Sequence, residues 1–164
     1  MKAPMTLQIL PVYLNDHLAG SVAAIELVNH LRKLSKGTAR EKFFAGLQSE
    51  IEEDQKVLKD LIRELGETQS PVRKAAAWLT EKVGEVKLKL DDPGSGELLL
   101  LEALETLELG ILGKLGLWRA LAVASDRVPQ IKRLDLAKLE RRARAQQEQV
   151  EKERLQVARA AFGA

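Results

Sequence analysis

The most apolar run of the chain, residues 95–124, constrains the fold more than any other feature, because three glutamates stand in its middle. At about 100° per residue, its apolar side chains spread around nearly the whole circumference of a helix. Such a helix is normally buried on more than one face. It is not a membrane span, since the glutamates, Lys114 and Arg119 interrupt it. The run therefore predicts the central helix of a helical core.

Two of these glutamates, Glu105 and Glu108, fall within the main apolar sector of the predicted helix, and Glu102 lies at its edge. Charged side chains that face a core are costly unless they are paired, hydrogen-bonded, protonated or metal-bound. We therefore expect Glu105 and Glu108 to belong to a buried polar site.

Three glycines of the same run, Gly110, Gly113 and Gly116, each destabilise a helix by roughly 1 kcal/mol relative to alanine. We favour the interpretation that the backbone of a neighbouring helix approaches closely there. A phosphate-binding loop is disfavoured, because Glu108 stands where the GxxxxGK[ST] motif needs its first glycine.

Length and composition predict one all-α domain over residues 1–164. The chain is 45% hydrophobic and only 4% aromatic, and Ala, Leu, Glu, Lys and Arg dominate, as is typical of helical proteins. The net charge of +2 gives no reason to expect nucleic acid or a membrane as partner. The absence of cysteine and an N-terminal segment too short for a secretory signal favour a cytoplasmic location.

Break signals predict two helices in the first part of the chain. The first is expected over residues 12–34, after Pro11 and before the break at residues 35–37. The second is expected to begin at Thr38 as N-cap and to end at Gly66.

Two more helices flank the central one. Ser70-Pro71 is a start signal for a helix over residues 71–90, which the break at residues 91–97 ends. After a turn at residues 125–129, the last helix is expected to run to about Ala161.

Polar residues interrupt the apolar stripes of three helices: His17 in the first, Asp54 in the second and Gln146 in the last. Short turns predict that neighbouring helices form antiparallel hairpins, and a helix over residues 71–90 is long enough to return the chain to the opposite end. Counting residues from each turn then puts these three at one level with Glu105 and Glu108. We expect the five side chains to meet near the middle of one core.

Two stretches, EIEEDQKVLKDLIRELG and ALETLELGILGKLGLW, are similar to those of small bacterial proteins with a helical bundle fold. The whole chain, from VYLNDHLAG to the final helix, resembles the ferritin-like superfamily of four-helix bundles, in which a crossover joins two hairpins. This resemblance implies a four-helix bundle in which residues 71–90 form the crossover between the second and third core helices.

The ligand set of the dimetal members, a glutamate on helices one and three and Glu-x-x-His on helices two and four, is not preserved. Glu26, the only glutamate of the first helix, faces away from the core, and Glu50, Glu53 and Asp54 stand in place of Glu-x-x-His on the second. The last helix has no histidine. The resemblance therefore does not imply iron oxidation or storage.

One hypothesis is a metal site formed by His17, Asp54, Glu105 and Glu108, since one imidazole and up to three carboxylates suit Fe, Mn or Zn. Against it, a buried histidine near an aspartate is more often a hydrogen-bonded pair. The glutamates also have Arg119 or Arg142 as possible partners.

We favour a second hypothesis, a non-catalytic structural or interaction protein whose buried polar cluster fixes the helix register. The central helix has apolar surface on two sides, and we expect Trp78 or Trp118 to be exposed. Both features suit a homodimer.

A third hypothesis is a hydrolase in which His17 and Asp54 orient a base and Ser21 is the nucleophile. It is the weakest of the three, because no oxyanion hole or nucleophile elbow is visible in the sequence.

Overall fold

The computed structural model of this chain describes residues 6–67, 74–90 and 96–163. In these ranges the structure is all-helical, as the sequence predicts, and contains no strand. The helices are α1 (Thr6–Leu34), α2 (Ala39–Glu64), α3 (Lys74–Leu90), α4 (Gly96–Ala124), α5 (Pro129–Lys132) and α6 (Leu136–Phe162).

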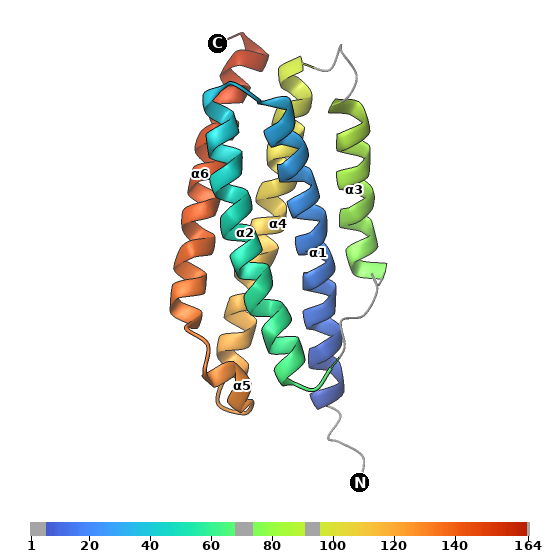
Figure 1. Cartoon of the computed structure of the whole chain (residues 1–164), viewed down its shortest axis with the longest axis vertical. Helices are drawn as coiled ribbons and strands as arrows, with labels where there is room; N and C mark the ends of the chain where they lie inside the picture. The colour runs from blue at the N-terminus through green and yellow to red at the C-terminus, as the bar shows by residue number, and fades with distance from the viewer. Residues whose placement is uncertain (1–5, 68–73, 91–95, 164) are drawn as a thin grey trace.

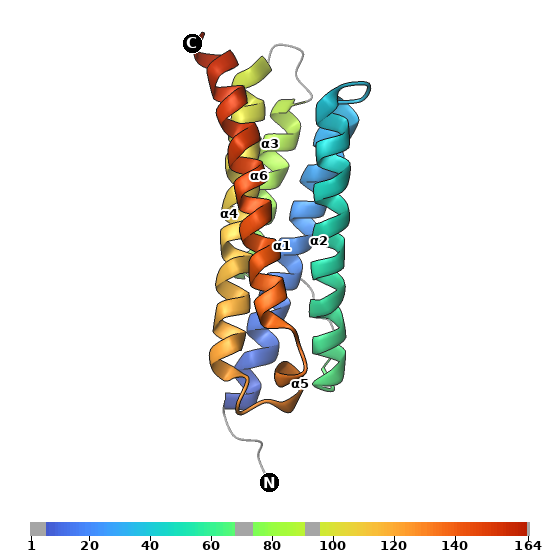
Figure 2. The same ribbon diagram turned by 90° about the vertical axis from the view of Figure 1, so that its left-hand side faces the viewer.

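The long helices lie side by side and alternate in direction, so that α1, α3 and α6 run one way while α2 and α4 run the other (Figure 1). The most extensive contacts join α4 to α6 and α1 to α2, and α3 packs against α1 and α4. Figure 2 shows α4 along one edge of the bundle, with its outer face covered by no described helix.

The first helix starts earlier than predicted. It begins at Thr6 and contains Pro11. Proline lacks the N–H that a helix interior uses, so it removes one backbone hydrogen bond. The side-chain amide of Asn15 donates a hydrogen bond to the backbone carbonyl of Pro11 at 2.9 Å.

The last helix is also divided differently from the prediction. The chain forms the short α5 after Val128 and breaks again before α6 begins at Leu136. Asp135 sets this second start, because its carboxylate accepts a hydrogen bond from the Lys138 backbone N–H at 2.9 Å.

The predicted boundaries of α2 are confirmed, with Thr38 at the N-cap position and Gly66 just past the end at a φ of +76°, where glycine is favoured. The predicted start signal at Ser70-Pro71 lies outside the described residues, as does most of the break at residues 91–97.

The core consists of two apolar clusters, one toward each end of the bundle. Ile51 of α2, Ile111 of α4 and Val150 of α6 belong to one cluster. Leu58, Leu115 and Ala143 of the same three helices belong to the other. On each helix a polar residue stands between these positions: Asp54, Lys114 and Gln146. The bundle therefore carries a polar level between two apolar ones.

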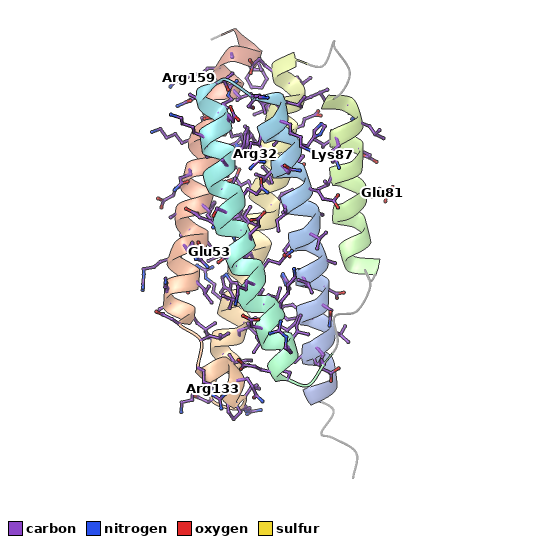
Figure 3. The ribbon with its side chains drawn as sticks, in the orientation of Figure 1. Arg32, Glu53, Glu81, Lys87, Arg133 and Arg159 are labelled. Carbon is purple, nitrogen blue, oxygen red and sulfur yellow. The ribbon has the colours of Figure 1, made fainter. Side chains whose placement is uncertain are left out.

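Charged side chains such as Glu53, Arg133 and Arg159 lie on the outside of the bundle (Figure 3). Over the described ranges, no helix combines the length and the apolar character that a membrane crossing needs.

Candidate functional site

The polar level is centred on Asp54, whose side chain is only 2% exposed. One carboxylate oxygen, Oδ2, accepts a hydrogen bond from the Lys114 ammonium of α4 at 2.6 Å. The other oxygen, Oδ1, is paired with the guanidinium of Arg142 from α6. The Gln146 amide donates to Oδ2 at 3.4 Å, and its Oε1 accepts from Lys114. Three helices are therefore joined by one carboxylate.

The prediction that Asp54 and Gln146 meet in the core is confirmed. The two cations that neutralise Asp54, Lys114 and Arg142, were not predicted from the sequence. Lys114 stands in the most apolar run of the chain, and that position alone should have indicated a buried partner of opposite charge. Arg142 also binds Glu53 at 2.7 Å, so it links the buried carboxylate to an exposed one.

Burial lowers the pKa of the Lys114 ammonium from its ordinary value, because a charged group loses hydration in the core. The carboxylate of Asp54 counteracts this change by stabilising the charged form. The Lys114 ammonium donates hydrogen bonds to both Asp54 and Gln146.

The prediction that Glu105 faces the core is wrong, since its side chain is 51% exposed. Glu108 is more buried, but it does not join the polar level. Instead Arg154 of α6 pairs with both glutamates, at 3.5 Å from Glu105 and 3.2 Å from Glu108, and with Glu151. Because apolar residues surround α4 almost evenly, the sequence did not show which of its faces turns outward.

The four residues of the predicted metal site are therefore not brought together as one ligand set. Asp54 is held by cations, Glu105 and Glu108 are held by Arg154, and His17 lies on α1. Across residues 6–67, 74–90 and 96–163, no group of three or more His, Cys, Asp or Glu side chains is arranged to hold a metal ion.

The arrangement around Ser21 does not favour the hydrolase hypothesis. The Ser21 hydroxyl donates to the Leu18 carbonyl at 2.6 Å and accepts from the Gln55 amide at 3.0 Å. Its proton is therefore directed to the backbone and not to His17. The ring of His17 packs edge-on against Tyr13, with 4.7 Å between the ring centroids.

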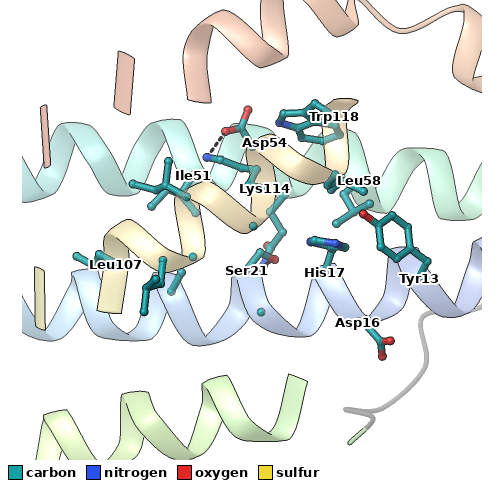
Figure 4. A pocket seen from close by; sticks show the side chains of 18 residues that line it. Tyr13, Asp16, His17, Ser21, Ile51, Asp54, Leu58, Leu107, Lys114 and Trp118 are labelled. Carbon is teal, nitrogen blue, oxygen red and sulfur yellow. Dashed lines mark hydrogen bonds and ion pairs between the residues drawn. The ribbon is translucent and has the colours of Figure 1, made fainter. Parts of the chain in front are cut away.

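A cavity of about 410 Å³ lies beside the polar level, between α1, α2 and α4. Most of its wall is apolar, and Figure 4 shows the side chains that surround it. Polar groups on the wall include His17, Ser21, Gln55 and Lys114. Burial lowers the pKa of the His17 imidazole, although the nearby Asp16 carboxylate opposes this change, so the neutral ring is favoured.

Trp118 also lines this cavity and is only 1% exposed, so the interpretation of Trp118 as an exposed residue is wrong. Its indole N–H is buried and has no hydrogen-bond acceptor within the described part of the chain. The side chain of Trp78 lies outside the described residues.

The glycines of α4 do not mark a close approach within this chain, contrary to the interpretation favoured from the sequence. A Cβ atom placed on Gly110, Gly113 or Gly116 would meet no atom of a neighbouring element within 4 Å. Gly113 and Gly116 are exposed, as are Leu109 and Leu112, and Leu109 and Gly113 also line the cavity.

Comparisons of the chain with protein-family models, with curated proteins and with solved structures give no match.

Proposed function

We propose that this protein is a non-catalytic interaction protein that works as a homodimer, with the outer face of α4 as the contact between the two copies. A ferritin-like arrangement, two antiparallel helix pairs connected through α3 as the crossover, is part of the same proposal. The alternating helix directions in Figure 1 support it. The observation that carries the dimer is a heptad seam on α4.

Eight positions of α4, spaced alternately by four and three residues, form this outer seam. They are Leu98, Glu102, Glu105, Leu109, Leu112, Gly116, Arg119 and Val123. All are exposed except Glu102, which is half-buried. This spacing is the a/d pattern by which two helices pack along their length. A monomer gains nothing from four large apolar side chains in water on one helix face.

The outer seam is complementary to itself when two copies run antiparallel. A two-fold axis between residues 110 and 111 places Leu109 against Leu112 of the second copy and Leu98 against Val123. In the same register Glu102 lies opposite Arg119 of the second copy. Every apolar position thus meets an apolar position, and an acid meets a base.

The remaining pair of that register, Glu105 opposite Gly116, gives a reason for a glycine in the seam. The absence of a side chain at Gly116 leaves room for the long side chain of Glu105 from the other copy. A parallel pairing would instead place Glu102, Glu105 and Arg119 each against its own copy, and like charges repel. The charge pattern therefore favours an antiparallel, two-fold dimer.

The polar level supports a structural role, because it joins three helices and so fixes their register. Asp54 reaches its partners only when α2, α4 and α6 are aligned within about one turn. A fixed register keeps the outer seam straight and in one orientation on the surface.

Analytical ultracentrifugation tests the dimer. We expect the parent protein to sediment at twice the chain mass of 18.2 kDa. Leu112→Glu should weaken association at least tenfold, because it places two new carboxylates at the two-fold axis. Val22→Glu on α1 is the matched control, since Val22 is 44% and Leu112 41% exposed, and it should leave the dimer intact. A parent protein that is monomeric at all concentrations, or a Leu112→Glu variant that still dimerises, would overturn the proposal.

Engineered cysteines test the direction, because the chain has none of its own. Leu98 and Val123 stand about 37 Å apart along α4, at about 1.5 Å per residue. Mixing Leu98→Cys with Val123→Cys under mild oxidation should give a disulfide between the two variants, while either variant alone should stay uncrosslinked. Crosslinking of Leu98→Cys to itself would show a parallel pair and contradict the proposed register.

A further inference from the structure

We propose that the cavity between α1, α2 and α4 is a binding site for a neutral, largely apolar small molecule. This inference goes beyond the proposed dimer. The cavity and the outer seam share only Leu109, and the wall residues that carry the inference all belong to one chain.

The shape and lining of the cavity determine the class of ligand. Its volume of about 410 Å³ is within the range of small-molecule sites, and apolar side chains from three helices form most of its wall. Ile51 and Leu58 of α2, Leu107 and Leu117 of α4 and Tyr13 of α1 belong to the wall. Figure 4 shows Ile51, Leu58, Leu107 and Tyr13 around the cavity. A ligand with a flat or compact hydrocarbon body would bury its surface here.

The charges at the wall exclude a strongly ionic ligand. The Lys114 ammonium is committed to Asp54 and Gln146, and the Asp54 carboxylate is committed to Lys114 and Arg142. The imidazole of His17 is favoured in its neutral form. The Asp16 carboxylate, which also belongs to the lining, points away from the other labelled wall side chains (Figure 4). An anion or a cation would therefore lose its hydration in the cavity without gaining a free counter-charge.

Gly110 offers a way to close the cavity without damaging the fold. It lies in the wall, and a Cβ added there meets no neighbouring atom within 4 Å. Gly110→Leu should therefore place its side chain in the cavity, and it removes a glycine from a helix interior, which favours folding. Binding and stability are then expected to change in opposite directions.

The probe is 6-propionyl-2-(dimethylamino)naphthalene, a neutral fluorophore with an apolar body and one carbonyl acceptor. Titration into the parent protein should give saturable binding, one probe per chain, with blue-shifted emission. Gly110→Leu should weaken binding at least tenfold while the melting temperature stays the same or rises. Gly46→Leu is the matched control, because Gly46 is an exposed helical glycine of α2 outside the cavity, and it should bind like the parent.

Two further variants keep the test decisive. Ala24→Leu fills the cavity from the α1 side and should also weaken binding, so the result does not depend on Gly110→Leu alone. Leu112→Glu changes the outer seam and not the cavity, so the probe should bind this variant like the parent. Loss of binding in Leu112→Glu with full binding in Gly110→Leu would place the probe on the outer seam and overturn the proposal.

Absence of saturable binding to the parent protein would overturn the whole inference, and it would leave the proposed dimer unaffected.

Discussion

Two groups of ion pairs join α6 to its neighbours. Both pair carboxylates with Lys or Arg, but they differ in the burial of the carboxylates and in the helices that they connect. Asp54, 2% exposed, is held by Lys114 and Arg142 inside the bundle. Arg154, itself 23% exposed, pairs with Glu105, Glu108 and Glu151, whose side chains are 51%, 18% and 37% exposed. The inner group links α2 to the α4–α6 pair, whereas the outer group lies along helices that already pack closely.

The difference between the two groups is the solvent around the charges. At the surface, water and salt screen the attraction between ions, and such pairs contribute little to stability. The Asp54 carboxylate has lost its hydration in the core, and Lys114 and Arg142 are only 15% and 19% exposed, so the removal of one partner leaves buried charge uncompensated. The inner group should therefore control the fold, while the outer group should be replaceable.

The largest effect is expected from Asp54→Ala. Lys114 and Arg142 would both lose their buried partner, and we expect the free energy of unfolding to fall by about 3–5 kcal/mol in urea denaturation. Glu53→Ala is the control, because Glu53 also pairs with Arg142 but is exposed, and its loss should be small. A change below about 1 kcal/mol for Asp54→Ala would remove the contrast between the two groups.

A double-mutant cycle of Asp54→Leu and Lys114→Met should show strong coupling. Asp54→Leu leaves both Lys114 and Arg142 without their buried partner, and Lys114→Met leaves Asp54 with Arg142 alone. The double change replaces the Asp54–Lys114 pair with apolar side chains of similar size and leaves Arg142 with Glu53. We expect the double variant to be more stable than the sum of the single losses predicts, with a coupling energy of about 1–3 kcal/mol. Additive losses would indicate that the two side chains act independently.

A moderate, pH-dependent effect is expected from His17, which lies next to the polar level on the cavity wall. Burial lowers the pKa of its imidazole, so the unfolded chain binds this proton at a higher pH than the folded protein does. Stability should therefore fall as the pH drops from about 6.5, the ordinary value for histidine, toward the lowered value in the fold. His17→Gln should flatten this part of the profile of unfolding free energy against pH, and an unchanged profile would count against the burial of the neutral ring.

The smallest effect is expected from Arg154→Ala. Its ion pairs are at the surface, so the loss should be about 0–1 kcal/mol and should shrink further at high salt. Unfolding measured at low and at molar sodium chloride tests both statements. A loss as large as that of Asp54→Ala would mean that the outer group is structural as well.

The sequence predicted best where apolar and polar residues are segregated. On α2 and α6 the apolar stripe is narrow and regular, so the burial of Asp54 and Gln146 followed from their places in it. Turn residues such as Gly66 gave the ends of helices correctly. In these helices, one face is much more apolar than the other, so only a few orientations of the helix about its own axis bury the apolar face.

On α4 the sequence was insufficient, because a helix that is apolar all round has no preferred rotation of its own. Only packing against α1, α3 and α6 turned Glu105 outward and Trp118 inward, and brought Lys114 to Asp54. Partners on different helices are chosen by the relative placement of the helices, which local periodicity does not contain. The sequence by itself thus determined the helices and the buried acid, and the tertiary structure decided the counter-ions, the cavity and the outer seam.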